Sequence, residues 1–398
     1  MLSKLSLKFL NHQKCQHLLA TCTRNFTGMY DFNYAEVVRD AKVVDFRSDT
    51  FSLPNEGMRR AIYNAEVGDE VYSEDPTVQV LEQRCSKLTG KEAACFVPSG
   101  TMGNLISILV HCDKRSSEII AGSLSHINLF EQTGAAQFGG VNIREVPNNN
   151  DGTFDIEELK SRIRTYDIHE PITKLICVEN THNILGGKTL PLDWIDEIGE
   201  FGKSRKIPLH MDGARIFNAA INCNVPISRL VQDFDTITFC FSKGLGAPYG
   251  AMIHGTTKFI DQAKRVRKAL GGSARQTGFM AAAALYALDN LAHLRDDHEN
   301  VHKIANAIRE ANNPYVTVPP RTDIHSNILL VYVNPAKLTA DDLAHRLREV
   351  SPMDDYPIVI KTLPLTPDKL RITLCCNNSD SDVEDAIMKI KTVINEYK

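Results

Sequence analysis

The amino-acid sequence predicts an α/β protein with a mostly parallel sheet in a large domain, followed by a smaller α+β domain. The chain has 398 residues, enough for about two domains. From about residue 90, short apolar runs alternate with helix-length amphipathic segments, a pattern typical of parallel strands joined by crossover helices. After about residue 290 this alternation ends. Because 43% of the residues are hydrophobic, both domains can bury a core.

The elements of the large domain follow one another in the order that crossover units require. The expected strands are AACFVPSG, SEIIAG, VNIREVPN, KLICVEN, IPLHMDGAR and TITFCFSK. The helices expected between them include 101–111, 155–163 and 193–205. The α/β pattern covers roughly residues 46 to 290, and we assign residues 31–290 to this domain.

The second domain is predicted from the segment that follows. A long helical stretch over 278–312 leads to the strand-like run ILLVYVN, a polar helix from 340, the run LRITLCCN and a final helix from 380. Two strands and two helices in this order favour an α+β unit over residues 291–398.

Composition excludes several classes of function. The formal charge is −4 with 24% charged residues, so the composition has no basic surplus that would indicate binding to nucleic acid or to an anionic membrane. There is no apolar run of about 18 residues and no zinc-finger or Walker pattern. The ten cysteines form no CxxC pair. They are interpreted as reduced thiols of an intracellular protein, without a disulfide framework or a metal site.

The first thirty residues differ from the rest of the chain. They contain Lys4, Lys8, Lys14 and Arg24 and no acidic residue before Asp31. Basic and apolar residues alternate without a continuous secretory core, which is typical of a mitochondrial presequence. We therefore expect residues 1–30 to be a leader that directs the protein to the mitochondrial matrix. The alternative is a basic tail on a cytoplasmic protein.

Polar groups follow four of the predicted strands at the point where each strand ends. They are Ser99-Gly100-Thr101, Glu179 to His182, Asp212 to Arg215, and Ser242-Lys243. In an open α/β sheet the ligand lies beyond the carboxyl ends of the strands, so these groups are expected to converge on one crevice.

Together these groups match the requirements of pyridoxal 5′-phosphate. Lys243 would hold the cofactor aldehyde as a Schiff base, and Asp212 would keep the pyridine nitrogen protonated. The turn at Ser99, Gly100 and Thr101 would bind the phosphate at the start of a helix. A dinucleotide fingerprint is the competing interpretation of the glycines after Lys243. GLGAPYG, however, has the wrong spacing and contains a proline.

Eight blocks, in order, resemble the low-specificity threonine aldolases. They are VDFRSDT, GDEVYSEDPTVQVLE, VPSGTMGN, SHINLFEQTG, ENTHNILGGKTLPL, HMDGARIFNAA, FSKGLGAPYGA and GGSARQTG. The resemblance covers residues 44 to 375 and implies the aspartate-aminotransferase-like fold, fold type I of the pyridoxal-phosphate enzymes. It also implies Lys243 and Asp212 in the roles given above.

The resemblance further assigns residues to the cofactor and the substrate. Ser48, Arg215 and Arg371 would bind the amino-acid carboxylate, for which the planar arginine fork is suited. His126 would lie against the pyridoxal ring and near the substrate hydroxyl. His169 matches a family histidine near the substrate, so the proton acceptor could be His126, His169 or a bound water.

The implied reaction is retro-aldol cleavage of threonine, allo-threonine and other β-hydroxy-α-amino acids to glycine and an aldehyde. A β-eliminating lyase or aminotransferase reaction, or an inactive cofactor-binding scaffold, stays open as an alternative. The resemblance also implies a homotetramer built from dimers, with Tyr72 and Arg275 reaching a neighbour's cofactor. The chain departs from the family at Ser73, at Ser273-Ala274 and over residues 373–376, which bears on side-chain preference and rate.

Overall fold

A computed structural model of the chain describes residues 41–350 and 357–398. The expected leader, residues 1–30, lies outside the described residues. Residues 41–398 fall within one compact unit. Within the described ranges, no helix combines the length and the apolar character needed to span a bilayer.

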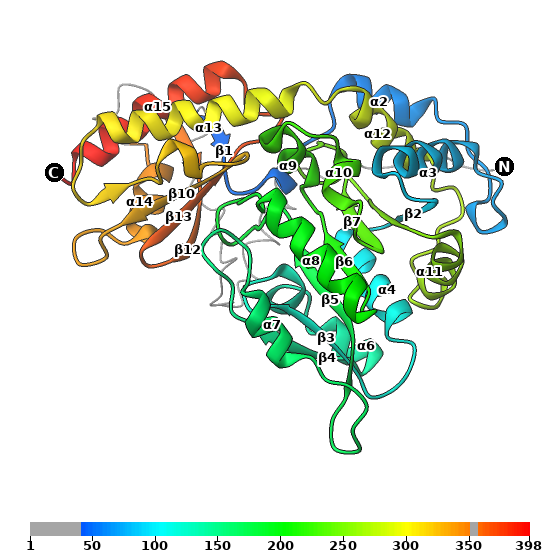
Figure 1. The fold of residues 1–398 in the computed structure, drawn as a ribbon. Coiled ribbons are helices and arrows are strands. Elements are labelled where there is room, and N and C mark those ends of the chain that lie inside the picture. Colours follow the sequence, from blue (N-terminus) through cyan, green and yellow to red (C-terminus); the bar gives the residue numbers. More distant parts are fainter. Residues whose placement is uncertain (1–40, 351–356) are drawn as a thin grey trace, which may run out of the picture. The chain divides into compact units, whose positions relative to one another are not determined.

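The largest sheet has seven strands in the order β2-β8-β7-β6-β5-β3-β4 (Figure 1). Pairing is parallel from β7 through β6, β5 and β3 to β4, which confirms the predicted mostly parallel sheet. β8 is antiparallel to both neighbours and was not predicted. The strands are β2 (Ala93–Val97), β3 (Ser117–Gly122), β4 (Asn142–Val146), β5 (Ile172–Glu179), β6 (Leu209–Asp212), β7 (Thr236–Cys240) and β8 (Ala251–Gly255).

Helices cover both faces of this sheet. Side chains alternate between faces along a strand, and in β7 Phe239 joins one buried cluster while Cys240 joins another. The helices of this region are α2 (Glu56–Tyr63), α3 (Pro76–Thr89), α4 (Gly100–His111), α5 (His126–Leu129), α6 (Gly134–Gly139), α7 (Ile156–Arg162), α8 (Leu192–Arg205), α9 (Ile216–Cys223), α10 (Ile227–Val231), α11 (Thr257–Ala269) and α12 (Gly278–Asp289). Short 3-10 turns occur at η2 (Asp49–Phe51) and η3 (Glu70–Tyr72).

The helical stretch predicted over 278–312 is not continuous. It is helical over most of its length but divides into two helices, α12 and α13 (His293–Glu310). Asn290 ends α12 because its backbone leaves the helical region, with φ −129° and ψ 54°. Its side-chain amide donates to the carbonyl of Tyr286 at 2.7 Å, which satisfies one of the orphan carbonyls of the helix end.

The C-terminal region forms an antiparallel sheet in the order β12-β13-β10-β9. Its elements are β9 (Val316–Thr317), η4 (Arg321–Asp323), β10 (Ile328–Val333), α14 (Ala340–Arg348), β11 (Ile358–Lys361), β12 (Leu363–Thr366), β13 (Lys369–Thr373) and α15 (Asp380–Asn395). Capping boxes at Thr339 and Ser379 begin α14 and α15.

The first described strand, β1 (Lys42–Asp45), belongs with this C-terminal region. It pairs in parallel with β11, and Val44 and Phe46 lie in the same buried cluster as α13, α14 and α15. The chain then enters the 48–51 segment, which carries Ser48 and Asp49. The division at residue 290 stays a prediction.

Candidate active site

The four predicted strand ends do lie along one edge of the large sheet. Glu179 is paired in register with Asp212, and Asp212 with Thr238 of β7. Val97 of β2 and Cys240 of β7 both pair with Ala251, so β2 also points toward this edge. Lys243 lies three residues beyond Cys240, the last residue of β7, so it and Asp212 belong to adjacent strand ends at the same edge.

Asp212 is buried within a network of polar side chains. The side-chain amide of Asn104, on α4, donates to Oδ2 of Asp212 and to Oε1 of Glu131, both at 2.9 Å. The backbone N–H of Ala214 donates to Oδ1 of Asp212 at 3.2 Å. The same Glu131 oxygen lies 2.8 Å from Nδ1 of His126. A single amide therefore connects Asp212 to the pair formed by His126 and Glu131.

The His126–Glu131 pair is electrostatically coupled to Asp212. Burial favours the neutral imidazole, but the hydrogen bond to Glu131 and the charge of Asp212 raise the pKa of His126. Burial, together with the Asp212 charge, also raises the pKa of Glu131, although His126 opposes this. The pair therefore retains a proton more readily than either side chain would in water.

Two further histidines, His210 and His111, hold the side chain of Asn104 through a chain of hydrogen bonds. His210 Nε2 lies 3.1 Å from Oδ1 of Asn104, and its Nδ1 lies 2.9 Å from the hydroxyl of Thr236. Since the amide oxygen can only accept, His210 donates from Nε2 and its Nδ1 accepts from Thr236. Thr236 then accepts from Nε2 of His111 at 3.0 Å. Burial lowers the pKa of His210 to about 3, so the ring is neutral.

Lys243 is half-buried and makes no hydrogen bond or ion pair with the residues that the structure describes. Its charge is nevertheless felt by Asp49, Cys240 and His126. An uncommitted ammonium group beside carboxylates at a strand end fits the lysine that pyridoxal phosphate requires.

The expected phosphate turn opens α4. Ser99 is the N-cap, and its hydroxyl accepts from the N–H of Met102 at 3.2 Å, so part of its hydrogen-bonding capacity serves the helix. A Cβ at Gly100 would meet Sγ of Cys240 at 2.6 Å, so only glycine lets α4 approach β7 this closely. Thr101 is exposed at the first turn. The turn therefore fits a phosphate, and its phosphate-binding role stays a prediction.

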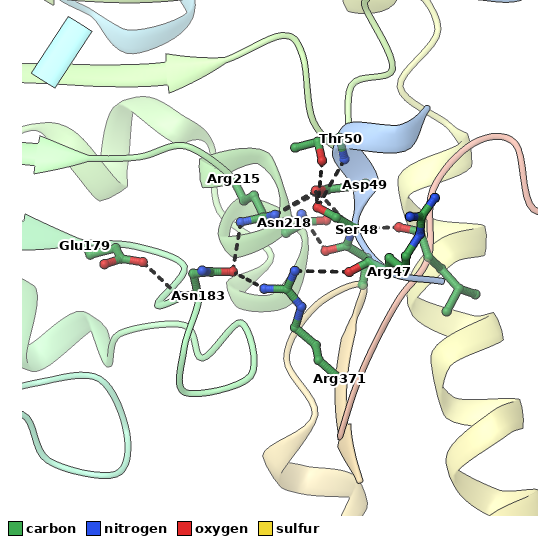
Figure 2. A network of polar contacts seen from close by, with 11 residues as sticks. Arg47, Ser48, Asp49, Thr50, Glu179, Asn183, Arg215, Asn218 and Arg371 are labelled. Atoms are coloured by element: carbon green, nitrogen blue, oxygen red, sulfur yellow. Dashed lines mark hydrogen bonds and ion pairs between the residues drawn. The ribbon is translucent and has the colours of Figure 1, made fainter. Parts of the chain in front are cut away.

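The predicted carboxylate residues lie together in a second network, drawn in Figure 2. Arg215 donates from Nε and Nη2 to the two oxygens of Asp49, both at 2.7 Å. Burial raises the pKa of Asp49, but the charge and hydrogen bonds of Arg215, together with the Lys243 charge and the Asn327 hydrogen bond, outweigh burial and lower the pKa to about 2. Nε and Nη2 of Arg215 are thus both engaged by Asp49. Nη1 is the remaining end of the guanidinium, and it points toward Asn183.

Asn183 connects the two predicted carboxylate arginines. Its amide oxygen accepts from Nη1 of Arg371 at 3.0 Å and from Nη1 of Arg215 at 3.4 Å (Figure 2). Arg371 also donates to the carbonyl of Arg47 at 3.1 Å. Ser48 is buried beside Asp49, and its hydroxyl accepts from the N–H and the hydroxyl of Thr50. Ser48, Arg215 and Arg371 therefore converge.

Three predicted site residues lie elsewhere in the chain. Tyr72 is 72% exposed, and the Arg275 guanidinium, which pairs with Asp69, lies 5.9 Å from the ring of Tyr72. His169 is exposed in the segment between α7 and β5. That segment precedes β5, whereas the site follows it, and the eight residues of β5 span about 23 Å. A single chain does not bring His169 to Lys243.

Sequence reasoning missed Asp49, Asn104, Glu131 and Asn183. Each lies inside one of the eight quoted blocks, so the resemblance already contained them. Residue type alone assigned them no chemistry, because their function depends on partners far apart in the sequence.

Comparisons with known proteins show which families the chain resembles. The model of the family described as beta-eliminating lyase matches residues 45–333. The chain is 44% identical over 347 residues to a probable low-specificity L-threonine aldolase 2 of Arabidopsis thaliana, covering 86% of this chain and 95% of that protein. It is 43% identical over 270 residues to the low specificity L-threonine aldolase of Escherichia coli (strain K12), covering 68% and 80%.

Solved structures share the fold at lower sequence identity. A putative L-allo-threonine aldolase from Listeria monocytogenes EGD-E matches with a TM-score of 0.70 and 20% identity, covering 85% of this chain and 93% of that one. A serine palmitoyltransferase from Sphingomonas wittichii matches with a TM-score of 0.68 and 18% identity, covering 96% and 95%.

Proposed function

The chain belongs to the low-specificity L-threonine aldolases, within the family of beta-eliminating lyases, and we propose that it cleaves L-threonine and L-allo-threonine to glycine and acetaldehyde. It is a carbon–carbon lyase of fold type I, and it uses pyridoxal 5′-phosphate, as the sequence predicted. The observation that carries the proposal is the convergence of Ser48, Arg215 and Arg371 beside the strand ends of Asp212 and Lys243.

The residues present fit the cofactor. Lys243 would attach it, Asp212 would hold its ring nitrogen, and the turn at Ser99, Gly100 and Thr101 would bind its phosphate. When bound, pyridoxal phosphate supplies an electron sink for negative charge that develops at Cα. Asn104 would keep the Asp212 carboxylate oriented, because it donates to Oδ2.

The arginine network would orient the substrate. A carboxylate held by Arg371, with Nη1 of Arg215 and the hydroxyl of Ser48 alongside, fixes the rotation of the amino acid about its Cα. That rotation decides which bond to Cα is broken, so the carboxylate contacts select Cα–Cβ cleavage. These three roles are supported by convergence and remain proposals.

His126 would contact the β-hydroxyl. Its Nδ1 is engaged by Glu131, which leaves Nε2 to face a substrate, and the side chain keeps 24% of its surface exposed. A hydrogen bond from this position would select amino acids with a hydroxyl on Cβ. The rest of the side chain would matter less.

Product analysis tests the function directly. Purified, cofactor-loaded protein is supplied with L-threonine, L-allo-threonine, phenylserine and 2-aminobutyrate, and glycine, aldehyde, pyruvate and keto acids are measured. We expect glycine and aldehyde from the three hydroxy amino acids and neither from 2-aminobutyrate, which has no hydroxyl proton to lose. Release of no aldehyde from any of them would refute the aldolase assignment, and pyruvate or keto acid would favour the elimination or aminotransferase reaction.

We propose that the active form is a homo-oligomer, a dimer of dimers. The support is the exposure of Tyr72 and Arg275 and the distance of His169 from its own Lys243. Residues exposed in one chain would then complete the site of a second copy. Sedimentation of the purified protein, with activity measured across a dilution series, tests this. A fully active monomer would overturn it.

We also propose import into the mitochondrial matrix, where the enzyme would contribute to threonine breakdown and glycine formation. The support is the basic, acid-free composition of residues 1–30. A fluorescent reporter fused after residue 30 should enter mitochondria. A reporter that stays diffuse in the cytosol would overturn this proposal and leave the enzymatic one untouched.

A further inference from the structure

Arg215 cannot offer its planar fork to a substrate. Nε and Nη2 are committed to the two oxygens of Asp49, a fully buried side chain whose pKa is lowered to about 2. The Asn327 amide donates to the same carboxylate at 3.2 Å, which fixes it further. What Arg215 presents toward the site is therefore its Nη1 end, and a second donor must supply the other contact to a carboxylate.

The amide oxygen of Asn183 lies at the point where Arg215 and Arg371 meet. It accepts 3.4 Å from Nη1 of the first and 3.0 Å from Nη1 of the second (Figure 2). A carbonyl oxygen has two lone pairs, so it can accept both bonds at once. Two guanidinium groups repel each other, and an acceptor between them offsets part of that repulsion.

Asn183 is itself held from the opposite side. Its backbone N–H donates to Oε1 of Glu179 at 2.8 Å, and Oε2 of Glu179 accepts from the N–H of His126 at 2.6 Å. The N–H of Gly186 donates to the carbonyl of Asn183 at 3.1 Å and closes the turn. The position of the amide is thus set by the same carboxylate that anchors the helix of His126.

We propose that Asn183 is a positioning residue of the carboxylate site. It holds the Nη1 atoms of Arg215 and Arg371 where both can donate to one oxygen of the substrate carboxylate. The proposal rests on the proposed function for the identity of the substrate, an α-amino acid. The neutral amide orders the two donors without competing strongly, because an anionic carboxylate makes the stronger, charge-assisted bonds.

Asn183→Asp provides the sharpest test, because it places a permanent carboxylate between the two arginines. The internal anion should compete with the substrate carboxylate. In the holoenzyme we expect KM for L-threonine to rise by about tenfold or more while kcat changes by less than about threefold. Glycine affinity measured by calorimetry should fall by the same factor, and Tm should rise because a new ion pair forms.

Two further variants serve as controls. Asn183→Ala removes the bridge without adding a charge, so KM should rise less than in N183D and Tm should not increase. Asn306 on α13 is exposed, and its Oδ1 accepts from Nη1 of Arg309 at 2.8 Å. Asn306→Asp therefore repeats the same chemical change on the surface, and its KM and glycine affinity should match those of the wild type.

The outcomes separate this inference from the proposed function. An unchanged KM and glycine affinity in N183D, within about twofold of wild type, would overturn the positioning role. If N183D does not fold, unchanged values in N183A would overturn it equally. If wild type binds glycine but releases no aldehyde, the aldolase proposal fails, whereas a loss of glycine affinity in N183D would still support the role of Asn183.

Discussion

The carboxylate of Asp49 accepts two 2.7 Å hydrogen bonds from the guanidinium of Arg215, 166 residues away in the sequence. Both side chains are buried, and Asp49 begins a short turn that follows β1. Since β1 pairs with β11, this ion pair joins the start of the described chain and the C-terminal region to Arg215, the N-cap of α9, three residues after β6. The pair is therefore structural as well as part of the site.

Removing the Asp49 carboxylate should destabilise the protein strongly. In Asp49→Ala the Arg215 charge stays buried without its partner, which costs about 3–5 kcal/mol in the free energy of unfolding. Chemical denaturation at pH 7 measures this. A combined D49A and R215L variant should recover part of the loss. A cost below about 1 kcal/mol for D49A would mean that Arg215 finds another partner.

The contribution of Asp49 should persist at mildly acidic pH. Its pKa is lowered from 3.8 to about 2 in the folded protein, so the stabilisation is fully present above about pH 4 and is lost as the pH falls through 2. The difference between wild type and D49A in the free energy of unfolding should be constant from pH 8 to pH 4. A difference that already disappears at pH 5 would contradict the ion pair.

Lys243 should be the lysine that carries the cofactor. Lys243→Ala should lose covalent attachment and turnover, because no other lysine follows the strand next to Asp212 at this edge. Mass spectrometry of the borohydride-reduced protein identifies the modified residue. Lys268, exposed near the end of α11, provides the control, and K268A should retain both properties. A modified lysine other than Lys243 would refute the assignment.

Asn104 should control both cofactor affinity and the titration of His126. Asn104→Leu leaves Glu131 and Asp212 without their shared donor, and each buried carboxylate loses about 1–3 kcal/mol of hydrogen bonding. We expect weaker pyridoxal phosphate binding in an absorbance titration and a changed pKa of His126 by NMR in the apoprotein. Wild-type affinity together with an unchanged His126 titration would reduce Asn104 to a packing role.

Much of the fold could be predicted because its strands and helices are indicated by patterns within short stretches of the sequence. Strands such as Ser117–Gly122 and Thr236–Cys240 are short apolar runs between helices, and polar residues mark their carboxyl ends. The expected edge of the sheet followed from the polar groups at four strand ends, Asp212 and Lys243 among them. β8 was missed because AMIHG follows a glycine-rich segment with no helix before it, and its antiparallel pairing requires none.

The remaining features depend on contacts between distant residues. Nothing in the sequence near Lys42 shows that this strand pairs with β11, and nothing near Asn183 shows that two arginines meet at its amide. The break at Asn290 is also weakly encoded, since the helical pattern continues on both sides. The family resemblance indicates the site residues, but the partners that hold them come from elements far apart in the sequence.

Asp297 should make the protein less stable as the pH rises, and Asn at this position should relieve the effect. Asp297 lies on α13, only 3% exposed, and its Oδ2 has no hydrogen-bond partner among the described residues. Burial, assisted by the Asp49 charge, raises its pKa from 3.8 to about 8.

The folded protein therefore holds the proton of Asp297 between about pH 4 and pH 8 while the unfolded chain releases it, so stability falls as the pH increases through that window. Asp297→Asn removes this titration, and its stability advantage over wild type should grow from near zero at pH 4 to about 1–3 kcal/mol at pH 8, measured by denaturant unfolding. Asp296, exposed on the same helix, provides the comparison: its charge is the smallest of the three contributions to the raised pKa of Asp297, so any growth in D296N should be much smaller than in D297N. A D297N advantage that is constant with pH would show that Asp297 is ionised and solvated in the folded protein.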